Sequence, residues 1–85
     1  MTYTYRTKGV CSREMRLELN DDHTIRRVEV IGGCNGNLQG ISRLVEGMKA
    51  EDAIARMRGI RCGLKDTSCP DQLAIALTEA LAQAE

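Results

Sequence analysis

Four cysteines, Cys11, Cys34, Cys62 and Cys69, are spread along a chain of 85 residues that contains no phenylalanine and no tryptophan. A domain this short buries only about 60 to 65% of its surface on folding, and here the core must be built mainly from aliphatic side chains. Small cores of this kind often need a disulfide, a metal or a partner subunit for stability. The cysteines are therefore the residues that most restrict how the chain can fold.

The charge balance and the N-terminal segment limit the partners and the compartment. The 12 basic and 12 acidic residues give a formal net charge of zero, so we expect no general attraction to nucleic acid or to an anionic membrane. Residues 1–8 contain no apolar signal segment, and no stretch of the sequence has the length of a membrane span. We therefore expect a cytoplasmic protein. Because that compartment keeps thiols reduced, four cysteines favour a metal or redox chemistry over structural disulfides.

Alternating apolar and polar residues predict three strands in the first part of the chain. Tyr3 and Tyr5 alternate with polar neighbours in a short edge strand. Residues 13–31 have the pattern of an antiparallel hairpin, because two such segments flank the turn-forming residues 20–23. His23, the only histidine, is then a solvated turn residue rather than a metal ligand or a catalytic base.

Three helices are predicted after the strands. The glycine-rich segment 32–36 interrupts the sheet. Gly36 and Gly40 would share one helix face, where they either allow close approach to the sheet or, as the favoured explanation, simply fit into a tight core. A second helix is expected over residues 49–58, and a third begins near Ser68, which can cap it. In the first helix, directly after the glycine segment, apolar residues at three- and four-residue steps predict one buried face. That face would consist of Leu38, Ile41, Leu44, Val45 and Met48.

Strands first and helices afterwards indicate an α+β fold, with a small antiparallel three-stranded sheet followed by three helices packed on one face. We expect one domain over residues 1–85. The cysteines fall where the predicted elements meet. Cys11 precedes the hairpin, Cys34 links the sheet to the first helix, Cys62 lies in the last loop, and Cys69 starts the last helix.

The four cysteines suit a single metal centre. A helix N-terminus, where Cys69 is expected, offers free N–H groups and a partial positive charge that stabilise a thiolate. Four thiolates bind zinc in a closed tetrahedral site at about 2.3 Å, and the same set can ligate an iron–sulfur cluster. The spacing lacks the paired Cys-x-x-Cys elements of a zinc ribbon. The alternative that one or more of these cysteines is a small buried apolar residue therefore stays open.

Other kinds of functional site have less support in the sequence. Ser68 stands beside Cys69 with no histidine nearby to activate it, which excludes a nucleophile of the Ser–His type. The glycine segment 32–36 matches neither a Walker loop nor a dinucleotide fingerprint. The residues identify no catalytic centre, and thiol–disulfide chemistry by Cys62 and Cys69 stays as a redox alternative.

Two segments resemble a known family. Residues 33–41, Gly-Cys-Asn-Gly-Asn-Leu-Gln-Gly-Ile, and residues 67–71, Thr-Ser-Cys-Pro-Asp, are similar to the signatures of the TSCPD domain family. That family includes short stand-alone proteins with four cysteines, and a related domain lies at the C-terminal end of adenosylcobalamin-dependent ribonucleotide reductases. The resemblance implies an accessory domain or partner of a ribonucleoside-diphosphate reductase as an alternative to a purely structural metal-binding module.

More remotely, the order of the elements is similar to that of the iron–sulfur scaffold proteins of the IscU and NifU type. In those scaffolds three cysteines hold zinc or a nascent cluster, and Cys11, Cys34 and Cys69 occupy the corresponding positions here. The resemblance implies an iron–sulfur cluster assembly scaffold as a further alternative.

This sequence departs from the scaffold pattern at two places. The aspartate that follows the first cysteine in the scaffolds is absent, since Ser12 and Arg13 stand here, and Ser68 replaces the histidine before the last cysteine. Cys62 can supply the fourth ligand instead. A closed site of four thiolates, with zinc first and an iron–sulfur cluster second, is therefore favoured over a labile site that hands clusters on.

Overall fold

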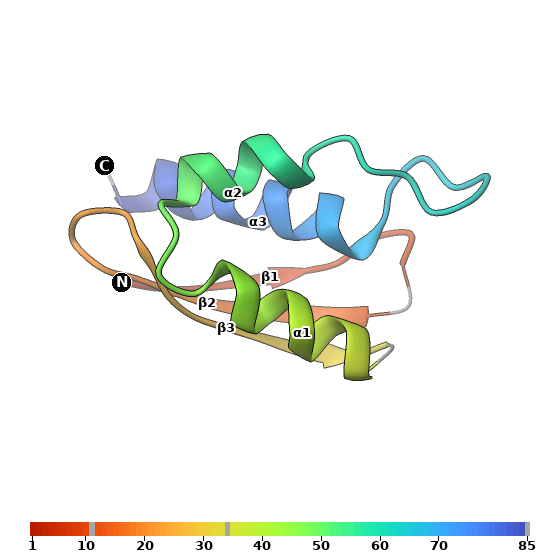
Figure 1. Ribbon diagram of the computed structural model, residues 1–85, viewed down its shortest axis with the longest axis horizontal. Coiled ribbons are helices and arrows are strands. Elements are labelled where there is room, and N and C mark those ends of the chain that lie inside the picture. The colour runs from red at the N-terminus through yellow and green to blue at the C-terminus, as the bar shows by residue number, and fades with distance from the viewer. Residues whose placement is uncertain (11, 34, 85) are drawn as a thin grey trace.

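The computed structural model describes residues 1–10, 12–33 and 35–84. β2 lies between β1 and β3 and pairs antiparallel with both. All three helices lie on one side of this sheet (Figure 1), so the predicted α+β fold is confirmed. In chain order the elements are β1 Thr2–Arg6, β2 Ser12–Leu19, β3 Ile25–Gly32, α1 Asn35–Val45, α2 Ala50–Met57 and α3 Cys69–Ala84.

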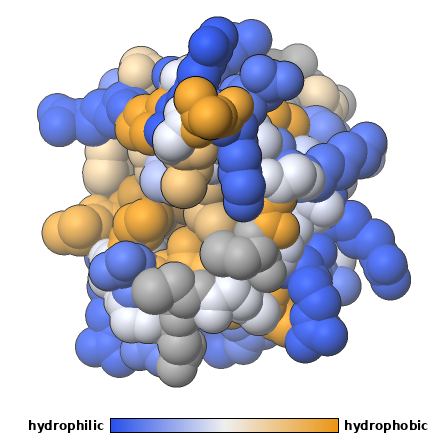
Figure 2. Space-filling view, turned by 90° about the vertical axis from the view of Figure 1, so that its right-hand side faces the viewer, coloured by the Kyte–Doolittle hydropathy of each residue, from blue (hydrophilic) through white to orange (hydrophobic). Residues whose placement is uncertain are grey.

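The helices divide the sheet between them. α3 packs over β1 and β2, α1 packs over β3, and α2 packs mainly on α3. Leu17 of β2 and Leu73 and Leu77 of α3 are no more than 1% exposed, because α3 lies between the sheet and α2. A groove remains between α1 and the other two helices, and Figure 2 views the end of the molecule where it opens. No helix in the described part of the chain is long and apolar enough to cross a membrane.

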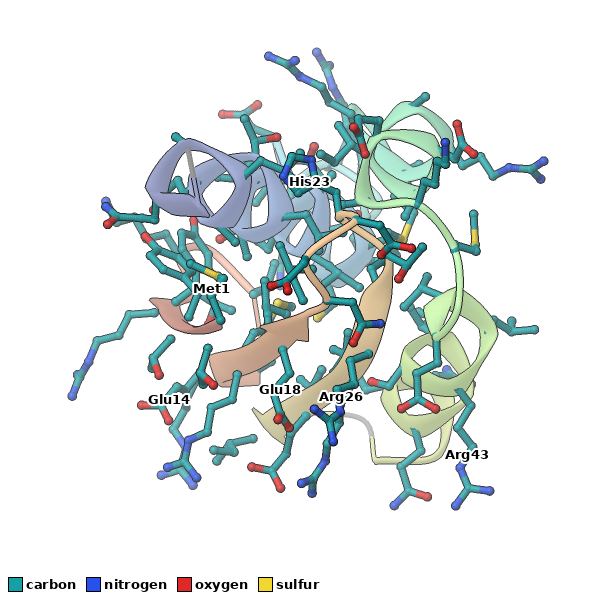
Figure 3. The ribbon with its side chains drawn as sticks, turned by 90° about the vertical axis from the view of Figure 1, so that its left-hand side faces the viewer. Met1, Glu14, Glu18, His23, Arg26 and Arg43 are labelled. Carbon is teal, nitrogen blue, oxygen red and sulfur yellow. The ribbon has the colours of Figure 1, made fainter. Side chains whose placement is uncertain are left out.

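The face of the sheet opposite the helices carries charged side chains of both signs. Arg16 and Arg27 form ion pairs with three glutamates of β2 and β3, at nitrogen–oxygen distances from 2.9 to 3.8 Å. Figure 3 shows two of these glutamates, Glu14 and Glu18, directed away from the helices. Ion pairs in water contribute only about 0–1 kcal/mol each. This face is a solvated surface, and the core lies on the other side of the sheet.

A bulge in β2 changes the direction of its first side chain. In a regular strand Ser12 would share the outer face with Glu14 and Arg16. The register between β2 and β3 shifts between Ser12 and Glu14, and Ser12 is only 3% exposed on the helix side. An extra residue in a strand produces such a reversal. The sequence predicts the hairpin but not this bulge.

Substitution by alanine should change the free energy of unfolding in opposite directions at two glycines. Gly32 has a φ of +82°, and an added Cβ would meet Arg13 at 3.3 to 3.4 Å, so Gly32→Ala should lower the free energy of unfolding by about 1–2 kcal/mol. Gly40 lies inside α1 with no atom within 4 Å of an added Cβ, so Gly40→Ala should raise it by roughly 0.5–1 kcal/mol. Urea unfolding measures both, and effects of the same sign would contradict this account.

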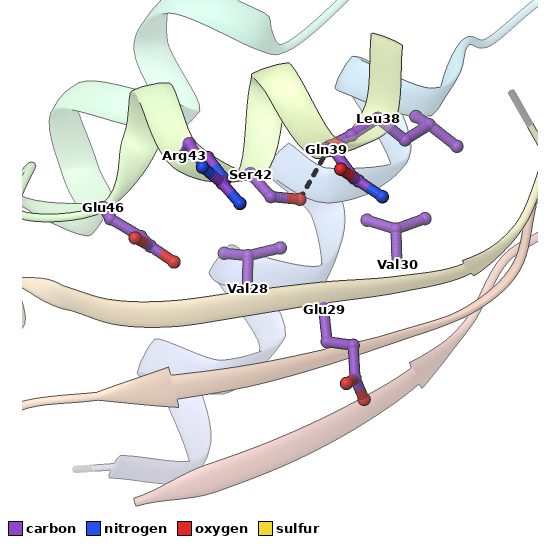
Figure 4. Close-up of a pocket in the computed structure, with 8 residues that line it drawn as sticks. All are labelled: Val28, Glu29, Val30, Leu38, Gln39, Ser42, Arg43 and Glu46. Carbon is purple, nitrogen blue, oxygen red and sulfur yellow. Dashed lines mark hydrogen bonds between the residues drawn. The ribbon is translucent and has the colours of Figure 1, made fainter. Parts of the chain in front are cut away.

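Two predictions for α1 are wrong. Leu44, expected on the buried face, has a side chain that is 77% exposed, while Ser42 is 7% exposed and lies on the side of α1 that faces β3 (Figure 4). Gly36 and Gly40 do not approach the sheet, since an added Cβ on either would meet nothing within 4 Å. The reason is that α1 packs mainly on one edge strand, which covers only a narrow side of the helix. Ser42 can be buried there because its hydroxyl donates to the Leu38 carbonyl at 2.8 Å.

Candidate functional site

The groove beside α1 contains two of the four predicted metal ligands. It consists of two adjoining cavities of about 490 and 440 Å³, which share Ile41, Leu44 and Pro70 as walls. Figure 2 shows apolar side chains gathered around the hollow at this end of the molecule. Cys62 and Cys69 both line the larger cavity. Folding therefore brings two cysteines from different segments to one cavity.

Cys69 is the first residue of α3 and is half-buried. Its Sγ lies 3.4 Å from the Oγ of Ser12, the residue that the β2 bulge turns toward the helices. Ser12 directly follows Cys11 in the sequence. The contact thus joins the first turn of α3 to the start of β2, a segment far away along the chain.

Cys62 has an exposed side chain on a backbone that is held on both sides. Its N–H donates to the Thr67 carbonyl at 3.2 Å, and its carbonyl accepts from the Lys65 N–H at 3.0 Å. Gly63, at the turn between these two bonds, has a φ of +58°. The loop that carries Cys62 is therefore folded back on itself and presents the thiol at the cavity.

Cys11 and Cys34, the other two predicted ligands, lie outside the described residues. Gly36, which follows Cys34 by two positions, lines the same cavity as Cys62 and Cys69. In residues 1–10, 12–33 and 35–84, no group of three or more His, Cys, Asp or Glu side chains is arranged to hold a metal ion. Only two of the four cysteines, Cys62 and Cys69, are among these described residues. That all four cysteines meet at one metal ion therefore stays a prediction.

A buried carboxylate organises the start of α3. Asp71 is 8% exposed and accepts hydrogen bonds from the Thr67 hydroxyl and, at 2.7 Å, from the Gly59 N–H. The bond from Thr67, then that from Gly59, and the charge of Arg58 together hold the pKa of Asp71 below its ordinary value. The sequence signal was the capping pattern in which an acid follows Ser68 by three residues. It predicts the cap but not the bond to Gly59.

Gln72 links β1 to the first turn of α3, and the sequence analysis did not predict this role. Its Oε1 accepts from the Tyr5 hydroxyl and from the Lys8 N–H, both at 2.9 Å, and its Nε2 donates to Thr67 Oγ1 at 3.1 Å. The side chain is 4% exposed, so these bonds satisfy a buried amide. No local pattern could reveal them, because Tyr5 and Gln72 are distant in the chain.

The two tyrosines provide a titration test of this packing. Burial first, and then the charges of Glu79 and Asp71, raise the pKa of Tyr5 above 10.0, and a hydrogen bond to Glu79 is the main cause that raises the pKa of Tyr3. A raised pKa stabilises the fold fully below pH about 10, and this contribution is lost as the pH rises toward the folded value. In a titration followed by ultraviolet absorbance, both phenols should show a higher pKa in the folded protein than in the protein unfolded by denaturant. Tyr3→Phe isolates Tyr5, and a native Tyr5 that titrated with the unfolded value would refute the packing.

His23 lies at the other end of the molecule, in the turn between β2 and β3 (Figures 1 and 3). Its carbonyl accepts from the Ala50 N–H at 2.9 Å, and Nδ1 of its half-buried ring lies 3.8 Å from a carboxylate oxygen of Glu51. The predicted position in a turn is confirmed, but the residue is half-buried and its ring faces a carboxylate, so it is only partly solvated. The histidine is not among the residues that line the groove.

Comparison with known proteins gives one match. The sequence model of the TSCPD domain family matches residues 1–81, a range that includes all four cysteines and reaches into α3. The chain has no significant match among the curated proteins or the solved structures. The remoter similarity to scaffolds of the IscU and NifU type therefore has no support from these comparisons and stays a prediction.

Proposed function

This chain belongs to the TSCPD domain family, and from that premise we propose that it is a metal-binding module with a structural or accessory role. Its ligands would be Cys11, Cys34, Cys62 and Cys69, and the first candidate metal is zinc. The observation that carries the proposal is that Cys62 and Cys69 line one cavity, with sequence neighbours of the other two cysteines at the same place. A core without phenylalanine or tryptophan gains most from such a cross-link.

The chemistry of the cavity fits a soft, thiolate-bound metal. The described residues that line it include no carboxylate, the ligand that magnesium and calcium sites in proteins mainly use, so the lining favours a soft metal over these hard cations. The N–H groups at the start of α3 would stabilise the thiolate of Cys69. Four thiolates close the coordination sphere of zinc, which makes the site structural and leaves no open position for a substrate. An iron–sulfur cluster is the second candidate for the same ligands.

Metal analysis of protein isolated without oxygen tests the proposal. We expect about one zinc per chain after growth in zinc, and a visible absorption spectrum would instead identify an iron–sulfur cluster. Protein that retained less than about a tenth of an equivalent of any metal, and that took up none on reconstitution, would refute metal binding.

Thiol–disulfide chemistry is the second candidate function, because Cys62 and Cys69 are free cysteines that line a common cavity. Here the two thiols would pass two electrons and two protons to the disulfide of a partner, so that one S–S bond forms in this chain while the partner's S–S bond breaks to give two thiols. Thiol counts before and after reduction separate the two functions. A metal site loses thiol reactivity when metal is bound and regains it with a chelator, whereas a disulfide responds only to a reductant.

Family membership also supports a partner for this module. Because a related domain ends the adenosylcobalamin-dependent reductases, the partner proposed here is the large subunit of a ribonucleotide reductase. The chain of 85 residues would act as an accessory and not as the catalytic unit. Co-purification with that subunit supports the idea, and reductase activity that is the same with and without the module would refute it.

A further inference from the structure

The loop that carries Cys62 is closed at both ends by the first turn of α3. Before the loop, the Gly59 N–H donates to Asp71 Oδ1 at 2.7 Å. After the loop, the Thr67 hydroxyl donates to Asp71 Oδ2. One carboxylate therefore holds the two positions between which the loop leaves α2 and enters α3. These bonds are partly shielded from water, since Asp71 is only 8% exposed.

Ser68 fastens the same loop at a third point. Its hydroxyl donates to the Ile60 carbonyl at 2.6 Å and accepts from the Asp71 N–H at 3.1 Å. The side chain is 5% exposed, and it also lines the cavity that contains Cys62 and Cys69. Ser68 is thus both the cap of α3 and a tether for the residue two positions before Cys62. We refer to Thr67, Ser68 and Asp71 as the loop clasp.

We propose that Ser68 and Asp71 are positioning residues that hold Cys62 at the cavity beside Cys69, without contacting the metal themselves. The consequence for metal affinity rests on the proposed function. Cys62 is exposed, so packing of its own side chain does not fix its position. Its backbone bonds to Thr67 and Lys65 lie within the loop. Among the described residues, this loop is tied to the first turn of α3 by the loop clasp, to which Gln72 adds a bond to Thr67 Oγ1. Groups that orient metal ligands are typically worth about 10- to 100-fold in affinity.

Ser68→Ala tests the proposal in the full chain. The variant should bind zinc about 10- to 100-fold more weakly in competition with a chromophoric chelator, and Ser68→Thr, which keeps the hydroxyl, should restore affinity. Ser42→Ala is the matched control. Ser42 is another buried serine, 7% exposed, whose hydroxyl donates to a backbone carbonyl at 2.8 Å. Its loss should leave zinc affinity unchanged, since it lies between α1 and β3.

A second measurement keeps this inference separate from the proposed function. In the metal-free protein, the amide hydrogen of Cys62 should exchange faster in Ser68→Ala than in Ser42→Ala. If Ser68→Ala does not fold, Thr67→Val removes the bond to Asp71 and takes its place in both assays. Unchanged zinc affinity and unchanged exchange at Cys62 would overturn the positioning role. A wild-type chain that takes up neither zinc nor an iron–sulfur cluster would refute the proposed function, and the exchange rates would then decide the role of the loop clasp alone.

Discussion

Replacing Cys69 with serine should weaken zinc binding on the order of 100-fold. Structural zinc sites of four ligands bind with about 10–16 kcal/mol, so one thiolate accounts for roughly 3 kcal/mol, which is on the order of 100-fold at room temperature. Cys69 is a proposed ligand that lies at the start of α3, with its Sγ 3.4 Å from the Oγ of Ser12. Serine keeps the size of the side chain but removes the soft thiolate. Competition with a chromophoric chelator measures the loss.

His23→Gln is the control for this experiment. It removes the only histidine of the chain, which lies in the β2–β3 turn, at the opposite end of the molecule from the cavity that Cys62 and Cys69 line. Zinc affinity should not change. Cys62→Ser provides the sharper comparison, because Cys62 is exposed. If Cys62→Ser bound zinc like the wild type while Cys69→Ser did not, Cys62 would be a surface thiol and the closed four-thiolate site would be wrong.

Leu77→Ala should cost about 3 kcal/mol of unfolding free energy, within the range of about 2–5 kcal/mol for buried leucines. Leu77 is 0% exposed, in the helix that packs on the sheet and on α2. The cavity left by alanine cannot be filled from either side without moving one of these layers. In a domain of this size the melting temperature should fall by roughly 10–25 °C. Thermal and urea unfolding of the chelator-treated protein measure the effect without a contribution from metal.

Leu44→Ala is the matched control for Leu77→Ala. Leu44 is also a helical leucine, but 77% of its side chain is exposed on α1. The change should therefore stay within about 0.5 kcal/mol. A cost for Leu44 equal to that for Leu77 would show that the assignment of buried and exposed faces in α1 is wrong.

The element order and most element boundaries could be predicted from the sequence, because they depend on neighbours close along the chain. Alternation in residues 13–31 predicts the β2–β3 hairpin, and Ser68 marks the start of α3. Gly47 and Gly59, with φ of +88° and +86°, follow the ends of α1 and α2, where a left-handed conformation favours glycine. A glycine just beyond an apolar helical stretch is a local signal for a helix end, and the sequence carries this signal at both places.

The tertiary structure alone decided which faces are covered and which distant segments meet. Periodicity placed Leu44 on an apolar stripe, but α1 packs mainly on one edge strand, so part of that stripe stays in water. The contact of Ser12 with Cys69 depends on a bulge, and the bonds of Gln72 to Tyr5 and Lys8 join residues far apart in the chain. A local pattern records which side of an element is apolar. It carries no information about which other element comes to lie against that side, because that depends on how the whole chain packs.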